Sequence, residues 1–164
     1  MRWDMGERTE DALVSYLKTK AGNDLRVSAA WERESTQFPA AIVKVVRTGP
    51  VSEDAEFHDS RLCQAEVAII TEGADKLDSS NAVLRTARER NRDATSQVMN
   101  ALFIKPVYTA GVETDSLPLR LNAQGVAAVG FSMAQFATTE PIQDGRHLIT
   151  IVAGEVIADP VEGT

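Results

Sequence analysis

Residues 78–103 lie within the longest stretch of the chain that contains neither proline nor glycine. Apolar residues recur there at helical spacings, at Val83, Ala87, Ala94, Val98, Ala101 and Leu102. This spacing predicts an amphipathic helix over 78–103 whose apolar stripe covers another element. Ser79 or Ser80 is the expected N-cap, and Pro106 closes the helix because proline cannot continue one.

Segments rich in apolar and β-branched residues flank this helix and predict strands that it can cover. The expected strands are 25–33, 40–46, 61–71, 126–138 and 147–158. A second helix is expected from Thr9, as N-cap, to about Lys20. We therefore expect a single α+β domain over 1–164, with a mostly antiparallel sheet of about 4–5 strands packed by one long helix and an N-terminal helix. Residues 104–125 are expected to form an irregular arm or loop.

The last expected strand is apolar on both of its faces. Leu148, Thr150 and Val152 alternate along it with Ile149, Ile151 and Ala153. Strands with two apolar faces are typically covered on both. We expect the helix on one side and another subunit or layer on the other.

The composition limits the possible partners and compartments. The formal charge of −7 disfavours nonspecific nucleic-acid binding, which depends on neutralising phosphates. The single cysteine, Cys63, excludes an intramolecular disulfide, and its apolar surroundings predict a buried, unreactive thiol. The first residues do not resemble a signal peptide, and no run approaches the ~20 apolar residues of a membrane-spanning helix. We expect a protein made and kept in cytoplasm-like conditions.

Residues 48–60 form a polar, acidic connection between two expected strands. The ligand-type side chains in it are Glu53, Asp54, Glu56, Asp59 and His58. A calcium loop needs a defined spacing with a glycine bend, and a zinc site needs several His or Cys residues. Neither pattern is present, so we expect a solvated loop, with no metal ion and no other cofactor.

The sequence contains no catalytic pattern. His58 and His147 are far apart in the chain, no GxSxG motif surrounds a serine, and no glycine-rich phosphate loop is present. We therefore expect no catalytic residues and no enzyme activity.

Four arginines cluster in the expected central helix, namely Arg85, Arg88, Arg90 and Arg92. Such a row could contact the acidic surface of a neighbouring copy, because arginine is enriched at interfaces, or DNA passing nearby. It could also be a solvated face paired with the acidic residues between the arginines. The negative net charge favours the solvated face over DNA contact, and contact with a neighbouring copy stays open.

Short pieces of the chain resemble the tail terminator (tail completion) proteins of long-tailed phages. Those proteins carry a segment of the form FPAVAV followed by TG, then an acidic stretch, a strand of the form WQAELHIEV and a helix. The matching pieces here are residues 38–43 (FPAAIV), 48–49 (TG) and 64–69 (QAEVAI). The order of elements also agrees over most of the chain, which departs from the pattern in its longer helix and in the added 104–125 segment.

The resemblance implies a structural virion protein of the phage tail or neck that is assembled in the host cytoplasm. Such proteins form a ring, typically a hexamer, that caps the tail tube and forms the head–tail joining surface. The implied partners are other copies of the chain, the tail tube protein and the head completion or connector protein. DNA passes through the ring without sequence-specific binding, and no membrane is involved. We expect the two long connections to carry contacts, and the candidate interface residues are Glu53, Asp54, Glu56, Asp59, Arg85, Arg88 and Arg92.

Two other functions stay open. One is another head–tail connector, neck or tail protein of the same general fold. The other is a small ligand-binding or regulatory α+β domain that works as a monomer or dimer. The oligomeric state separates them, because a ring favours assembly and a monomer favours the binding domain.

Overall fold

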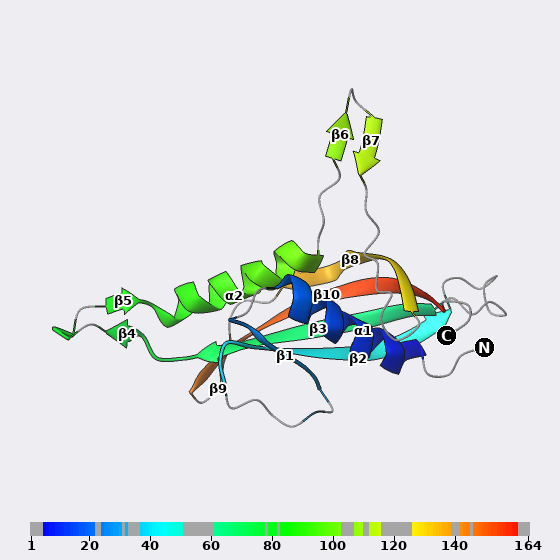
Figure 1. The fold of residues 1–164 in the computed structure, drawn as a ribbon. Coiled ribbons are helices and arrows are strands. Elements are labelled where there is room, and N and C mark those ends of the chain that lie inside the picture. The colour runs from blue at the N-terminus through cyan, green and yellow to red at the C-terminus, as the bar shows by residue number, and fades with distance from the viewer. Residues whose placement is uncertain are drawn as a thin grey trace.

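Two helices pack on one face of a sheet in this computed structural model (Figure 1). The helices are α1 (Met5–Lys20) and α2 (Ala87–Leu102). The structure describes residues 5–21, 24–30, 32, 37–50, 61–77, 79–81, 83–102, 107–109, 112–115, 126–138, 142–144 and 146–160. No helix in these ranges is long and apolar enough to cross a membrane.

The main sheet has six strands within the described residues, in the order β1-β2-β3-β10-β8, with β9 also paired to β10. The strands are β1 (Arg26–Ala29), β2 (Ala40–Pro50), β3 (Arg61–Glu72), β8 (Val126–Thr138), β9 (Ile142–Asp144) and β10 (His147–Pro160). β1 runs parallel to β2, and the other pairings are antiparallel. The predicted α+β class and mostly antiparallel sheet are confirmed, with the number of strands slightly underestimated.

The strands alternate between a helix-covered face and a second, partly exposed face. Along β3, Cys63, Ala65, Val67 and Ile69 are buried under the helices, whereas the residues between them are half-buried. β10 repeats this alternation, with Val152 buried and Ile151 half-buried. The predicted helical cover on one face of β10 is therefore present, and the predicted cover on the other face stays a prediction.

The core lies between this sheet face and the two helices. Val43, Val67 and Val152 are neighbours on three adjacent strands, and each is fully buried. α1 contributes Leu13 and Leu17, and α2 contributes Val98 and Leu102. Burying one such aliphatic side chain stabilises the fold by about 1.5–3 kcal/mol. Because the chain has few aromatic residues, its core consists mainly of aliphatic side chains.

The central helix is shorter than predicted. Residues 78–86 do not belong to it, because β4 (Lys76–Leu77) and β5 (Val83–Arg85) form a hairpin before Ala87. The prediction of Ser79 or Ser80 as N-cap is wrong. The cap is Thr86, whose Oγ1 accepts a hydrogen bond from the backbone N of Glu89 at 3.1 Å.

Two further boundaries differ from the prediction. α1 begins at Met5, so Thr9 is not its N-cap but a fully buried residue inside the helix. Within the segment 104–125, which we expected to be irregular, β6 (Val107–Thr109) and β7 (Val112–Asp115) form a hairpin. This hairpin stands away from the main sheet and follows the end of α2 (Figure 1).

Candidate functional site

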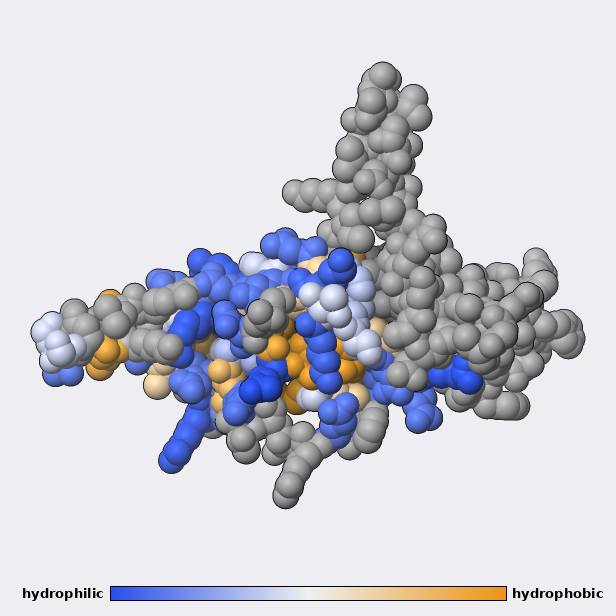
Figure 2. All heavy atoms as spheres, viewed as in Figure 1, coloured by the Kyte–Doolittle hydropathy of each residue, from blue (hydrophilic) through white to orange (hydrophobic). Residues whose placement is uncertain are grey.

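The β4–β5 hairpin projects from the end of β3, away from the main sheet (Figure 1). Leu77 and Val83 face each other across its two strands. Their exposed fractions are 51% and 56%, which is high for large hydrophobic side chains. Figure 2 shows apolar atoms on the surface of this projection. The hairpin therefore presents an apolar pair to its surroundings.

The base of the hairpin is fixed between the end of β3 and the start of α2. Asp75 Oδ1 accepts a hydrogen bond from Ala87 N at 2.8 Å, which ties the hairpin to the first turn of the helix. Gly73 N donates to the carbonyl oxygen of Arg146 at 2.7 Å, which ties it to the segment before β10. These bonds give the hairpin a defined direction.

Arg90 adds a third attachment at the hairpin base. Its guanidinium forms an ion pair with Glu72 at 3.6 Å and donates a hydrogen bond to the carbonyl oxygen of Ala74. The side chain is only 14% exposed, and its Nε is buried without a hydrogen-bond partner among the described atoms. One arginine thus links α2, β3 and the start of the hairpin.

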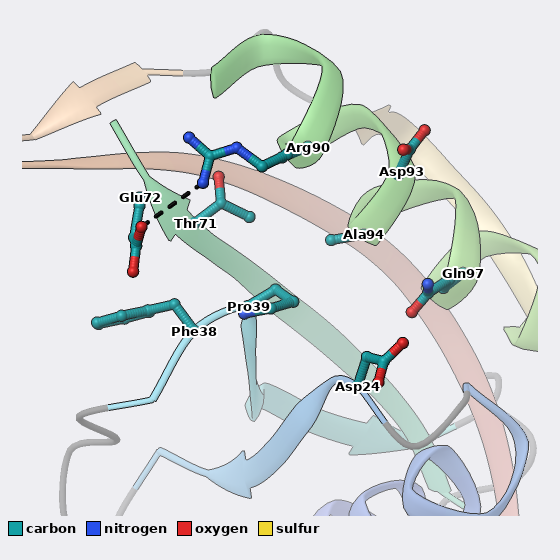
Figure 3. A pocket seen from close by; sticks show the side chains of 9 residues that line it. All are labelled: Asp24, Phe38, Pro39, Thr71, Glu72, Arg90, Asp93, Ala94 and Gln97. Atoms are coloured by element: carbon teal, nitrogen blue, oxygen red, sulfur yellow. Dashed lines mark ion pairs between the residues drawn. The ribbon is translucent and has the colours of Figure 1, made fainter. Parts of the chain in front are cut away.

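A pocket of about 290 Å³ lies beside this base, between α2 and the residue pair that precedes β2 (Figure 3). Three carboxylates line it, contributed by Asp24 before β1, Glu72 in β3 and Asp93 in α2. Phe38 forms one wall, and its ring also packs against His147 with the ring centroids 4.5 Å apart. Among the described residues of its lining, the acids outnumber the basic side chains, so the pocket is suited to a small positively charged group.

The predicted interface residues are only partly brought together. Arg88 and Arg92 lie one turn apart on the exposed side of α2. Arg85 lies in β5 rather than in the helix, so the predicted continuous row is wrong at that position. Arg90 turns inward to the hairpin base. The acidic residues Glu53, Asp54, Glu56 and Asp59, together with His58, lie outside the described residues.

Buried polar groups occupy the opposite end of the sheet, under α1. β2 has a bulge between Val45 and Arg47. Glu10 lies beside it, and its Oε1 accepts a hydrogen bond from Val45 N at 3.0 Å. Desolvation raises the pKa of Glu10 above its usual value, and this effect outweighs the lowering by that hydrogen bond.

Cys63 lies near this bulge and is fully buried, as its surroundings predicted. Its Sγ lies 3.7 Å from Thr9 Oγ1. Burial raises the pKa of the thiol, so little thiolate forms at neutral pH. Among the described residues, no group of three or more His, Cys, Asp or Glu side chains could hold a metal ion.

Sequence reasoning missed the hairpin and its base. The available signal was the polar stretch 78–81 (DSSN), which consists of turn-forming residues between Leu77 and Val83. Asn81 adopts a positive φ of 64°, a conformation that asparagine tolerates better than most residues. The role of Arg90 had no comparable local signal, because its partners lie on β3 and in the turn after it.

Comparison with known proteins gives information on the fold. No family model matches the chain, and no curated protein matches it. Among solved structures, the chain is similar to a chain of the native gene transfer agent virion particle, with a TM-score of 0.53 and 8% sequence identity. The match covers 96% of this chain and 98% of the other. The two chains therefore share a fold over nearly their whole lengths.

Proposed function

We propose that this chain is a structural protein of a phage-like virion that acts as a tail terminator. In this role, copies assemble into a ring, typically of six, that caps the tail tube and forms the head–tail joining surface. The observation that carries the proposal is the shared fold with a chain of the gene transfer agent virion particle, which extends over nearly all of both chains. The resemblance of residues 38–43, 48–49 and 64–69 to tail terminator segments supports the same role.

The surface of the molecule also suits an assembling protein. The two hairpins β4–β5 and β6–β7 extend from opposite ends of α2 and stand away from the sheet (Figure 1). Projecting elements of this kind allow one copy to reach another or an axial neighbour. The chain carries a charge of −7, which suits a ring through which DNA passes without being bound.

Several contacts belong to the proposal. The partners are other copies of the chain, the tail tube protein and a head completion or connector protein. Arg88 and Arg92 are exposed on α2 and are suited to acidic surfaces of a neighbour. The acidic connection 48–60 and the segment 105–125 are proposed to carry axial or inter-subunit contacts. The role requires no catalysis and no cofactor.

The mass of the purified chain in solution tests this function. Light scattering on a sizing column, followed by negative-stain images, should give rings of about six copies, either alone or after addition of tail tube protein. A compact monomer at all concentrations, with no association to tail or head proteins, would contradict the proposal.

The pocket beside Arg90 favours a second candidate, a monomeric or dimeric domain that binds a small cationic ligand. The acidic lining, in which Glu72 already pairs with Arg90, and the Phe38 ring would provide charge and stacking for such a ligand. This function requires neither a ring nor virion partners. A monomeric chain whose thermal midpoint rises with a cationic amine such as arginine or spermidine would favour it over the terminator.

A further inference from the structure

The β4–β5 hairpin is attached at its base, but its apolar pair is not packed against another described element. Its strands span only Lys76–Leu77 and Val83–Arg85, and isolated two-stranded hairpins are marginal in water. Leu77 and Val83, its apolar pair, are each more than half exposed. Apolar side chains that project together into solvent typically mark a contact surface.

The hairpin cannot supply its own cover by folding back. Asp75, Gly73 and Arg90 hold its base against α2 and the segment before β10. Within the sheets of the described residues, β4 and β5 pair with each other and with no other strand. The hairpin continues the direction of β3 outward, away from the face of its own sheet (Figure 1). No described element of the chain pairs with the hairpin, which leaves the apolar pair open to contact with another molecule.

A matching surface lies on the face of the main sheet that the helices leave uncovered. Isoleucines from adjacent strands meet there in register, with Ile70 opposite Ile149 and with Ile42 and Ile151 on either side of Ala68. All five residues are half-buried. Polar pairs follow directly along the strands, with Lys44 opposite Glu66 and Gln64 opposite Glu155. An apolar centre with a polar rim is the usual anatomy of a protein interface.

The charges of the two surfaces are complementary. Residues 76–85 carry Lys76 and Arg85 against the single acid Asp78, so the hairpin is net basic. The chain as a whole carries −7, and the rim of the sheet face carries two acids, Glu66 and Glu155, against one base, Lys44. A basic hairpin on an acidic chain is favoured to meet the acidic surface of another copy.

We propose that the β4–β5 hairpin docks on the uncovered sheet face of a second copy of this chain, with Leu77 and Val83 packed on the isoleucines Ile42, Ile70, Ile149 and Ile151. This inference rests on the self-assembly in the proposed function and names the surfaces that produce it. Hairpin and sheet face are different surfaces of one chain, so the contact is head-to-tail. Repeated head-to-tail contacts close into a ring when the rotation between copies permits.

Complementation between two variants of the full chain tests the contact. One variant, Leu77→Asp with Val83→Asp, has a disabled hairpin and an intact sheet face. The other, Ile151→Asp, has a disabled face and an intact hairpin. We expect each alone to be monomeric and their equimolar mixture to form heterodimers, because one functional hairpin then meets one functional face. Val46→Asp is the matched control, since Val46 is also exposed, at 44%, but lies outside both surfaces.

Cross-linking gives a readout that does not depend on how the face variant folds. A copy with Leu77→Cys, mixed with a copy with Ile70→Cys, should form an intermolecular disulfide, whereas the buried Cys63 should not react. The hairpin variant should weaken self-association by on the order of tenfold or more while leaving thermal unfolding nearly unchanged.

The outcomes separate the two proposals. Wild-type rings together with equal rings of the hairpin variant would overturn the hairpin contact and leave the terminator role intact. A wild type that stays monomeric, alone and with tail tube protein, would overturn both. Loss of rings in the hairpin variant, with heterodimers in its mixture with the face variant, supports both.

Discussion

The hydroxyl of Thr150 donates a 2.5 Å hydrogen bond to the Oδ1 of Asn91, a residue 59 positions earlier in the chain. The amide of Asn91 in turn donates to Thr71 Oγ1 at 3.0 Å and to the carbonyl oxygen of Leu148 at 3.3 Å. Asn91 is only 1% exposed, so these contacts replace water completely. One side chain of α2 thus fixes the position of the helix over β3 and β10.

Replacement of Asn91 by alanine should lower the free energy of unfolding by about 1–3 kcal/mol, because it leaves buried donors and acceptors without partners. Asn100→Ala, at an exposed position of the same helix, is the control and should change stability by less than about 0.5 kcal/mol. Chemical denaturation of the two variants measures the difference. Equal stability of both would show that the network contributes nothing.

The start of α2 gives a second prediction. Thr86→Ala removes the side-chain acceptor for Glu89 N and should cost about 1 kcal/mol. Ser79→Ala alters an exposed turn residue of the hairpin and should be nearly neutral. Thermal melts of both variants measure the two changes in stability. A larger loss of stability in Ser79→Ala than in Thr86→Ala would indicate that the helix begins near Ser79, as the sequence alone suggested.

Two glycines provide a matched pair for a third prediction. A Cβ at Gly73 would lie 2.9 Å from the carbonyl oxygen of Arg146, which is too close for a backbone contact. Gly73→Ala should therefore destabilise the chain by about 1–3 kcal/mol and loosen the hairpin base. A Cβ at Gly49 meets nothing within 4 Å, so Gly49→Ala should be neutral or slightly stabilising. The local readout is faster hydrogen exchange at the backbone amide of residue 73 in the Gly73→Ala variant.

The buried carboxyl of Glu10 predicts a pH dependence. Its pKa is raised by desolvation, so the native state binds the proton more tightly than the unfolded chain does. The free energy of unfolding contributed by this group therefore rises as the pH falls through the native pKa toward the ordinary value of 4.5. Glu10→Gln removes the ionisable group while keeping an oxygen for Val45 N. The variant should be more stable than wild type at pH 7, and this advantage should shrink near pH 4.5. A difference that stays constant with pH would contradict the effect.

Local pattern was sufficient for most of the sheet. The apolar run 61–71 and the run 126–138 lie where β3 and β8 are found, because β-branched and alternating residues favour a pleated, half-buried surface. The parallel pairing of β1 with β2 could not be predicted in this way. It depends on where the connection between the two strands brings the chain back, and the four residues of β1 carry no signal for direction.

The candidate site was harder to predict because its structure depends on contacts distant in sequence. Val83 fits the helical spacing of the residues after it, and it also fits a hairpin with Leu77 across a polar turn. The hairpin is favoured over a longer helix because Asp75 and Arg90 hold the hairpin base against the first turns of α2. Similarly, the bulge between Val45 and Arg47 explains why a carboxylate, Glu10, is buried on α1, and a bulge leaves no mark in the sequence.

The position of the hairpin after β3 has a mechanical consequence. β3 is an inner strand, bonded to β2 on one side and to β10 on the other. Antiparallel hydrogen bonds lie perpendicular to the strands, so tension applied to the hairpin along β3 strains both ladders in shear, with many bonds resisting together. A force of the same size applied to an edge strand, perpendicular to its length, would instead break its hydrogen bonds one after another. In the proposed contact, a copy held through this hairpin would withstand a strong pull from its neighbour before its own sheet begins to separate.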